Sequence, residues 1–450
     1  MDKTWMAVLV IAVVAIGAWA VFGSNKGVDK SKIVKIGISQ IAPHVVLDRE
    51  PIVEENKPSP ITSESLPIVL YCANSRYPHS NSVTEEFPEI AAAGFNVLQS
   101  YQFEVANYNL DPWNSDEAAR EYLDAAERNG LKVLLGLAIG LHDDTIKKDL
   151  RFIKKRVPLF KDHPALFGWQ LADEPASIPI PLANLERAYQ KINTIDPVHP
   201  VTIAEVADID EGYPYLAALP FDIWMPDSFV TIPLESYHGR RKVLRNAVEI
   251  LASRGKSVIP HLNVGNLAKD RVSCPPDIAD QYPECTINRY PTAEEMRFVA
   301  YDMLAQGARG LSFLCYRYNY DEDDPGDDIS FKNNPSQWQA IASVASELKT
   351  MSPILTAPDS KLSIGISPPD TEIEFISKAY QDAVYLIATN PSPEEKEITF
   401  TFTLKQPISL VNVLHESRTI VPRQSRDGRK QTYSFTDKFR DYAVHVYEIR

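Results

Sequence analysis

The stretch LFGWQLADE, residues 166–174, is an apolar run that ends in two acids, and Pro175 follows it. Near-continuous apolar strands are typical of parallel sheets that are buried on both faces. Two carboxylates at the end of such a strand are costly to bury unless a site uses them. The stretch therefore predicts a buried parallel strand whose carboxyl end, at Asp173 and Glu174, faces a functional site.

Seven further apolar runs of strand length surround this one, and segments of helical period separate most of them. Eight such units between residues 67 and 355 predict an α/β fold, a closed (β/α)8 or TIM barrel. The alternative is an open doubly wound sheet, which would carry a Gly-rich phosphate turn after its first strand. The chain has no glycine there, because Cys72 is followed by Ala-Asn-Ser-Arg. The other predicted strands are residues 66–74, 94–101, 131–138, 200–206, 221–229, 256–264 and 308–317.

The pattern changes after residue 355. Runs such as EIEFISKA and AVYLIATN alternate with period two, and turn residues such as Asn390-Pro391 separate them. This pattern predicts a small all-β sandwich domain over residues 358–450. Its strands show no distinct row of exposed aromatic residues, so we expect it to cover the barrel rather than to bind a ligand.

The N-terminal segment differs from both domains. Residues 5–22 contain no charged residue, and eighteen helical residues reach about 27 Å, enough to cross a bilayer core. Two interpretations remain: residues 1–23 are a single-pass membrane anchor, or they are a signal peptide cleaved after Ala20. Residues 24–66 are predicted to be a tether. Either interpretation places the barrel outside the cytoplasm, on the cell membrane or secreted.

The four cysteines suggest an oxidising compartment. Cys274 and Cys285 lie close together in a Pro-rich loop, and we expect them to form a disulfide. Cys72 and Cys315 fall on the first and last barrel strands, which are neighbours, so a bridge between them can form but is not required.

The charge and the motifs exclude several classes of function. The formal net charge of -14 argues against nucleic acid as a partner. The sequence has no Gly-rich phosphate loop and no cluster of metal-ligand spacing, so we expect no cofactor and no metal. It gives no indication of the oligomeric state.

Polar and aromatic residues follow the predicted strands at their carboxyl ends, where the active sites of such barrels lie. Aromatic faces cover the apolar faces of sugars, while amides and carboxylates bind hydroxyl groups. This rim predicts a carbohydrate ligand, although loop packing is the alternative for any single residue. The candidate substrate-binding residues are Asn74, Tyr101, Gln170, Asp173, Glu205, Asn263, Tyr316 and Arg317.

Glu174 is the candidate general acid. A carboxyl group that is partly shielded at a strand end can have a raised pKa and protonate a glycosidic oxygen. The alternative is an acid that interacts with the dipole of the next helix. Glycoside hydrolysis ordinarily needs a second carboxyl group. Asp227, at the end of the sixth strand, is the first choice for it, and Glu205 is the second.

The stretch HPALFGWQLADEP, residues 163–175, resembles the fourth-strand motif of glycoside hydrolase clan A-like (β/α)8 proteins. In that clan an Asn-Glu-Pro or related triplet ends the strand, and its Glu is the general acid/base. Residues 289–318 and the C-terminal β-domain are also similar to parts of such proteins. The resemblance implies a TIM barrel with an attached β-domain, and the acid/base role for Glu174. One departure is plain: clan A enzymes carry a Glu at the end of the seventh strand, whereas residues 257–266 contain no carboxylate.

Three functions compete on these grounds. The first is a glycoside hydrolase that acts on an extracellular or cell-envelope carbohydrate. The second is a non-catalytic cell-surface protein that binds carbohydrate in the same cleft without a competent carboxylate pair. The third is a barrel enzyme of different chemistry, such as a lyase, for which His142 or His261 would be the base.

Overall fold

The structure is a computed structural model of the 450-residue chain. It describes residues 61, 65–74, 83–103, 114–137, 140–175, 180–205, 219–227, 232–266, 283–317, 331–404, 407–427 and 430–450.

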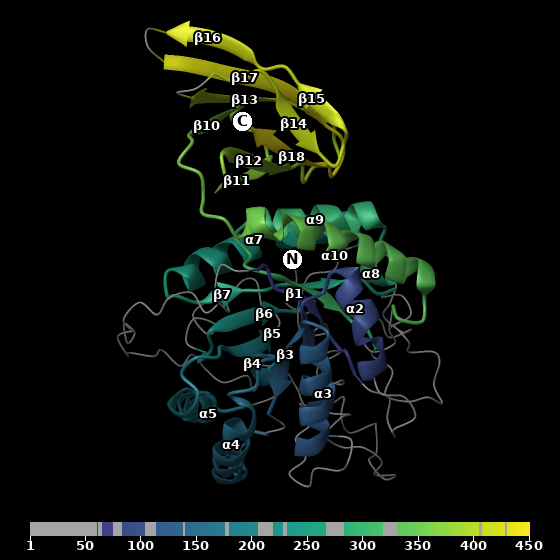
Figure 1. Ribbon diagram of the computed structural model, residues 1–450, viewed down its shortest axis with the longest axis vertical. Helices are drawn as coiled ribbons and strands as arrows, with labels where there is room; N and C mark the ends of the chain where they lie inside the picture. Colours follow the sequence, from purple (N-terminus) through teal and green to yellow (C-terminus); the bar gives the residue numbers. More distant parts are fainter. Residues whose placement is uncertain are drawn as a thin grey trace, which may run out of the picture.

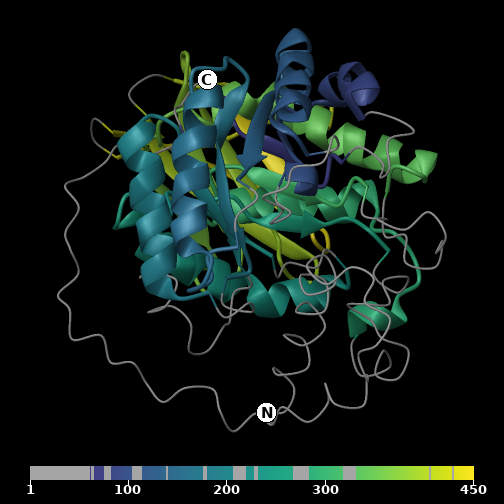
Figure 2. The ribbon, with the colours of Figure 1, turned by 90° about the horizontal axis from the view of Figure 1, so that it is seen from below.

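Parallel strands form a TIM-like barrel in the first domain (Figures 1 and 2). Their order in the sheet is β7-β6-β5-β4-β3-β2-β1-β9-β8. The two end strands β7 and β8 are parts of one short stretch, residues 257–263. That stretch bonds to β6 through Ile259 N–H to Trp224 O (2.9 Å) and to β9 through Ser312 N–H to Pro260 O (2.9 Å). The chain itself therefore joins the two ends of the sheet. The strands are β1 (Ile68–Leu70), β2 (Val97–Gln99), β3 (Lys132–Gly136), β4 (Leu166–Asp173), β5 (Val201–Glu205), β6 (Ile223–Pro226), β7 (Ser257–Val258), β8 (His261–Asn263) and β9 (Leu311–Leu314).

Amphipathic helices surround these strands (Figure 2). Local sequence fixes where several of them begin: the Ser115 side chain accepts a hydrogen bond from Ala118 N–H, and Thr292 and Glu295 form a reciprocal capping box. The helices are α2 (Phe87–Ala93), α3 (Asp116–Arg128), α4 (Ile146–Phe160), α5 (Leu182–Ile195), α7 (Leu234–Ala252), α8 (Pro283–Thr286), α9 (Ala293–Ala305) and α10 (Pro335–Leu355), with 3-10 turns η3 (Val83–Glu86) and η4 (Tyr101–Phe103).

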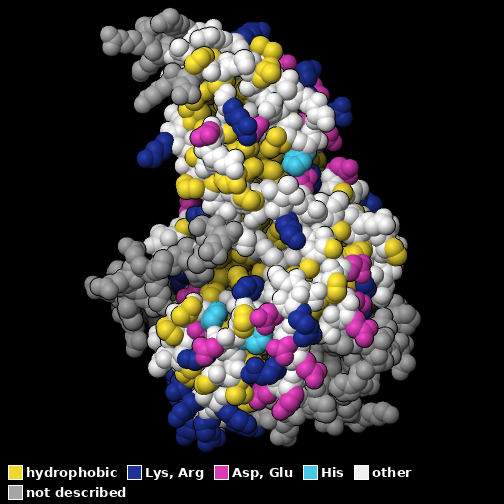
Figure 3. Space-filling model, in the orientation of Figure 1, with side chains coloured by type: hydrophobic (Ala, Val, Ile, Leu, Met, Phe, Trp, Pro, Cys, Tyr) yellow, Lys and Arg dark blue, Asp and Glu magenta, His cyan; other side chains and the backbone are white. Residues whose placement is uncertain are grey.

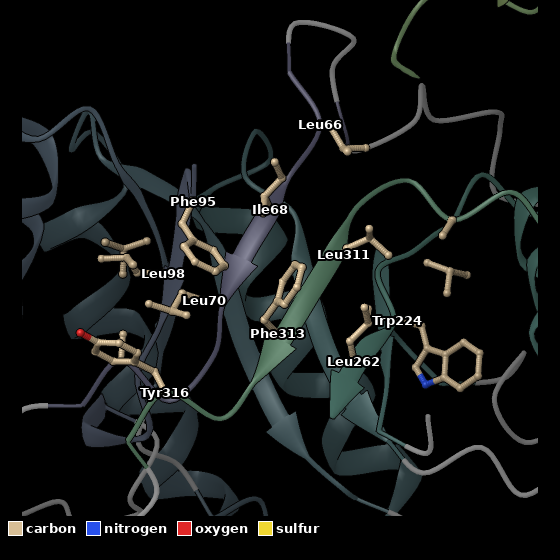
Figure 4. Close-up of a cluster of buried hydrophobic side chains, with 14 of the residues drawn as sticks. Leu66, Ile68, Leu70, Phe95, Leu98, Trp224, Leu262, Leu311, Phe313 and Tyr316 are labelled. Carbon is tan, nitrogen blue, oxygen red and sulfur yellow. The ribbon is translucent and has the colours of Figure 1, made fainter. Parts of the chain in front are cut away.

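The barrel core packs between the strands and these helices. Figure 4 shows Leu70 and Phe313 on the neighbouring strands β1 and β9, and both are fully buried. A disulfide between Cys72 and Cys315 also joins these two strand ends. The bridge that the sequence allowed between the first and last strands is therefore formed.

The second domain consists of two antiparallel sheets (Figure 1). The sheet order is β10-β13-β17-β16 in one and β11-β12-β18-β14-β15 in the other. Phe400, Phe435 and Tyr447 pack between them. The strands are β10 (Ile364–Ser367), β11 (Glu374–Tyr380), β12 (Ala383–Thr389), β13 (Lys396–Leu404), β14 (Val411–Leu414), β15 (Arg418–Ile420), β16 (Arg423–Asp427), β17 (Lys430–Phe439) and β18 (Val444–Ile449).

The β-domain sits on helices α7, α9 and α10 of the barrel, and Figure 3 shows the two domains as lobes joined at this face. Polar contacts cross the junction. Thr389 Oγ1 donates to Asp302 on α9 (2.8 Å), and Arg297 Nη1 donates to Val444 O (3.1 Å). A TIM-like barrel followed by antiparallel β-sheets, the predicted order, is therefore confirmed.

Some predictions lie outside the described residues. These are the anchor or signal peptide at residues 1–23, nearly all of the tether at residues 24–66, and Cys274 of the predicted disulfide. Cys285 itself is disulfide-bonded. Within the described part of the chain, no helix is both long and apolar enough to span a membrane. The predicted domain boundary at residues 355–358 falls between the end of α10 and the start of β10.

Candidate active site

Four carboxylates gather where three neighbouring strands end. Asp173 and Glu174 end β4, Glu205 ends β5, and Asp227 follows β6. Strand register aligns these ends: Asp173 pairs with Ala204, and Glu205 pairs with Pro226. Hydrogen bonds extend the alignment past the strands, from Glu174 N–H to Ala204 O (2.8 Å) and from Asp227 N–H to Glu205 O (3.2 Å). The parallel barrel thus brings together residues that are 54 positions apart.

Glu174 occupies an unusual environment. Its backbone has a φ of +45°, which costs a non-glycine residue free energy and is found most often at functional sites. Its side chain is 7% exposed, and Oε1 is buried without a hydrogen-bond partner. Burial, followed by repulsion from Asp173, Asp227 and Glu205, raises the pKa of Glu174 to about 10. Glu174 therefore holds a proton at neutral pH.

The pKa values of Asp173 and Asp227 are also raised. Burial raises the pKa of Asp173 to about 6, and a hydrogen bond from the Tyr101 side chain opposes the rise. Burial and repulsion from Asp173 and Glu205 raise the pKa of Asp227 well above its ordinary value. Of the two neighbours on β4, Asp173 is therefore mainly ionised at neutral pH, whereas Glu174 is mainly protonated.

One group of possible metal ligands lies on α3 and just before β4. In the described part of the chain, the one group of His, Cys, Asp or Glu whose ligand atoms lie within 4.8 Å of one another is Asp124, Glu127 and His163. His163 in that group is already bonded at both nitrogens, Nδ1 to Ala165 N–H (3.1 Å) and Nε2 to Asp124 (3.0 Å). None of the four carboxylates at the barrel mouth belongs to that group.

The side chains of three predicted substrate-binding residues are buried and form hydrogen bonds within the protein. Gln170 is 2% exposed; Thr202 Oγ1 donates to its Oε1, and its Nε2 donates to Tyr71 Oη (3.4 Å) and Ala172 O (3.3 Å). Asn74 is 5% exposed and bonds to three partners. Tyr316 is fully buried, as Figure 4 shows, and its hydroxyl donates to Glu86 (2.7 Å). For Tyr316, the packing alternative is the better interpretation.

Polar atoms without a hydrogen-bond partner occur near the strand ends, on the predicted residue Arg317 and on Asn266. Arg317 Nη2 bonds to Glu86, but its Nε and Nη1 are buried without a hydrogen-bond partner. Asn263 is partly exposed, and its Oδ1 accepts from Gly265 N–H (3.1 Å). Asn266 Oδ1, in the segment after β8, is also buried without a partner. Buried polar atoms without partners are rare in folded proteins and call for an explanation, and a polar ligand is one.

His261 and Tyr71 differ from what the sequence suggested. His261 is buried, its Nδ1 pairs with Ser312 Oγ (2.9 Å), and burial lowers its pKa to about 3. A pKa this low makes His261 a poor base, so His142 is the other candidate base of the lyase alternative. Tyr71 was not predicted, yet its ring contacts both Tyr101 and His261 edge-on. Only its place near the end of the first strand could have signalled this.

Comparison with known proteins gives the fold. No protein-family model matches the chain, and no curated protein matches its sequence. Among solved structures, an alpha-amylase from Geobacillus thermoleovorans complexed with acarbose aligns with a TM-score of 0.52 and 12% identity, over 85% of this chain and 98% of that one. An alpha-amylase from H. orenii aligns with a TM-score of 0.51 and 12% identity, over 87% of this chain and 100% of that one. A cyclomaltodextrinase aligns with a TM-score of 0.53 and 9% identity, over 88% of this chain and 80% of that one.

These comparisons do not confirm the resemblance to clan A. At identities of 9–12% they establish a shared fold: this chain is built like the alpha-amylase and cyclomaltodextrinase structures, as a TIM-like barrel followed by antiparallel β-sheets.

Proposed function

We propose that this chain is a glycoside hydrolase whose catalytic centre is the carboxylate group at the ends of β4, β5 and β6. The observation that supports it most is the contrast between Glu174, which stays protonated, and Asp173, which ionises near neutral pH. Pairs of titratable groups whose environments separate their pKa values are typical of an acid and its partner base. Glycoside hydrolysis needs such a pair.

In this proposal, Glu174 donates its proton to the glycosidic oxygen as the bond to the leaving sugar breaks. Asp173 supplies the negative charge that attacks the sugar, activates a water or stabilises the positive charge on the ring. Asp227 was the first choice for this second role. Asp173, whose pKa of about 6 leaves it mainly ionised at neutral pH, is assigned this role here, and Asp227 is the alternative.

The substrate class is proposed from the rim and from the structural neighbours. Alpha-amylases and a cyclomaltodextrinase share the fold, and one of these alpha-amylases is complexed with acarbose. We therefore place α-glucans first among the carbohydrates to be tested. The uncharged residues 5–22 support a location at the cell membrane or outside the cell, and an extracellular or cell-envelope carbohydrate as the natural substrate.

The test is hydrolysis of a panel of polysaccharides, maltooligosaccharides and aryl glycosides by the full chain. Glu174→Gln should lower kcat/KM at least about a hundredfold with folding intact, because it removes the proton donor. Glu186→Gln, an exposed glutamate on α5, is the matched control and should leave the rate unchanged. Asp173→Asn should cost more activity than Asp227→Asn.

Two results would count against the proposal. Turnover that survives Glu174→Gln would remove Glu174 from the mechanism. Sugar binding without turnover of any substrate would favour the non-catalytic carbohydrate-binding alternative, which the lack of a carboxylate on β8 already suggested.

A further inference from the structure

The side chain of Asn74 ties together the ends of three strands. It follows β1, its Oδ1 accepts from Ser100 Oγ (3.0 Å) and Tyr101 N–H (2.8 Å) just after β2, and its Nδ2 donates to Arg317 O (3.0 Å) just after β9. An amide that is 5% exposed and bonded to three partners offers little to a ligand. Its contribution to the site must pass through the residues that it holds.

The backbone that carries Asn74 is itself fixed. The Cys72–Cys315 disulfide lies two residues before Asn74 on one strand and two residues before Arg317 on the other. Cys72 N–H donates to Gln99 Oε1 (3.0 Å), and Arg317 N–H donates to Cys72 O (3.1 Å). Because these contacts are covalent or buried, Asn74 has little freedom to move relative to β2 and β9.

Tyr101 connects this fixed point to the carboxylates. Asn74 holds its backbone N–H, the ring of Tyr71 meets its ring edge-on at 5.4 Å, and its side chain hydrogen-bonds to Asp173 across the mouth of the barrel. We propose that Asn74, braced by the Cys72–Cys315 disulfide, is a positioning residue that holds the Tyr101 hydroxyl on Asp173.

The contact matters because burial favours the protonated, uncharged form of Asp173. Three further carboxyl groups, those of Glu174, Asp227 and Glu205, belong to the same cluster. A hydrogen bond donated to a carboxylate stabilises its ionised form. Loss of the Tyr101 contact should therefore raise the pKa of Asp173 above about 6. The inference rests on the proposed function only for the catalytic use of Asp173.

The experiment is a titration of Asp173 in the full chain with 13C-carboxyl-labelled aspartate, in which the Asp173 signal is assigned by its loss in Asp173→Asn. Tyr101→Phe should raise the pKa of Asp173 by about one pH unit, since it removes the donor. Asn74→Ala and Cys72→Ala/Cys315→Ala should raise it in the same direction. Asn74→Ala in the Tyr101→Phe background should add nothing, because Asn74 acts through Tyr101.

The chain offers a matched control at the opposite end of the same strands. Asn96 accepts from Ile68 N–H and donates to Leu66 O (both 2.8 Å), so Asn96→Ala breaks an equivalent link between β1 and β2 away from the carboxylates. It should leave the pKa of Asp173 unchanged. If Asn74→Ala does not fold, Asn74→Ser gives the same comparison.

Two outcomes overturn the proposal: a folded Asn74 variant with the wild-type pKa at Asp173, or an equal rise in Asn96→Ala. The titration does not depend on turnover. A raised pKa in a protein that hydrolyses no sugar would therefore sustain the positioning role and reject the proposed function.

Discussion

Two buried carboxylates on opposite sides of the barrel show how differently a protein can treat the same group. Asp302 on α9 is fully buried at the junction with the β-domain and accepts five hydrogen bonds. Glu174 at the barrel mouth is 7% exposed, and its buried Oε1 accepts none. Burial alone therefore does not identify a candidate catalytic acid, and the lack of a partner at Oε1 is what distinguishes Glu174 from Asp302.

The surroundings of Asp302 explain the difference. Arg241 on α7 pairs with both of its oxygens (2.7 and 2.8 Å), and Tyr237, Gln306 and Thr389 supply the remaining donors. The charge is thus neutralised and every strong contact is internal. Asp302 stabilises the fold, while the unpaired Glu174 costs stability and keeps a proton available.

The largest loss of stability from a single substitution should come from Asp302→Ala. Removing Asp302 breaks a buried ion pair and leaves Arg241 with only the more distant carboxylate of Glu374 (3.5 Å), and breaking a buried pair costs about 3–5 kcal/mol. Urea unfolding of the variant and the wild type would measure the difference. A loss below about 1 kcal/mol would mean that the junction does not depend on this network, and the contrast with Glu174 would lose its basis.

The second effect is a pH dependence of stability that Glu174 produces. Its pKa rises from 4.5 to about 10 on folding, so the folded state binds the proton more tightly. The stability from this group is present below pH 4.5 and is lost as pH rises toward 10, by up to about 1.4 kcal/mol per pH unit. Glu174→Gln should remove this loss and become more stable than the wild type at pH 8, in thermal melts read against pH. Parallel pH curves for the two proteins would show that the carboxyl group is not shifted.

The smallest effect should come from Thr389→Val. It removes one neutral donor from Asp302 and keeps the shape of the side chain, at a cost of about 1 kcal/mol. The same unfolding measurement applies, with Thr350→Val on the exposed face of α10 as the control. A loss as large as that of Asp302→Ala would indicate that the contact between the domains, rather than the ion pair, carries the stability.

Most of the barrel was predictable because its strands are short apolar runs that can be recognised from local sequence. Each of the eight predicted strands contains an observed one, and only the seventh is divided, into β7 and β8. The β-domain was harder to read. Three of its strands, β15 (RTI), β16 (RQSRD) and β17 (KQTYSFTDKF), were missed. Strands β15 and β16 are polar and partly exposed, so they lack the apolar alternation that reveals a strand.

The sequence predicted the acidic residues of the candidate site but not the hydrogen bonds that its other residues form. Asp173, Glu174, Glu205 and Asp227 were all identified, since each is an acid at the end of an apolar strand. Whether a rim residue faces a ligand or a neighbour depends on the register of distant segments. Tyr316 bonds to Glu86, 230 residues away, and Asn74 bonds to Arg317, 243 residues away. No local pattern reports such pairs.

The disulfide between Cys72 and Cys315 also determines what happens when a protease cuts the barrel. It connects residues 243 positions apart, so nearly every barrel strand and helix lies within one covalently closed ring. A protease that cuts any one loop between these cysteines cannot release a fragment, because both sides of the cut stay attached through the bridge. A single cut between these cysteines would thus leave the two parts of the barrel covalently joined.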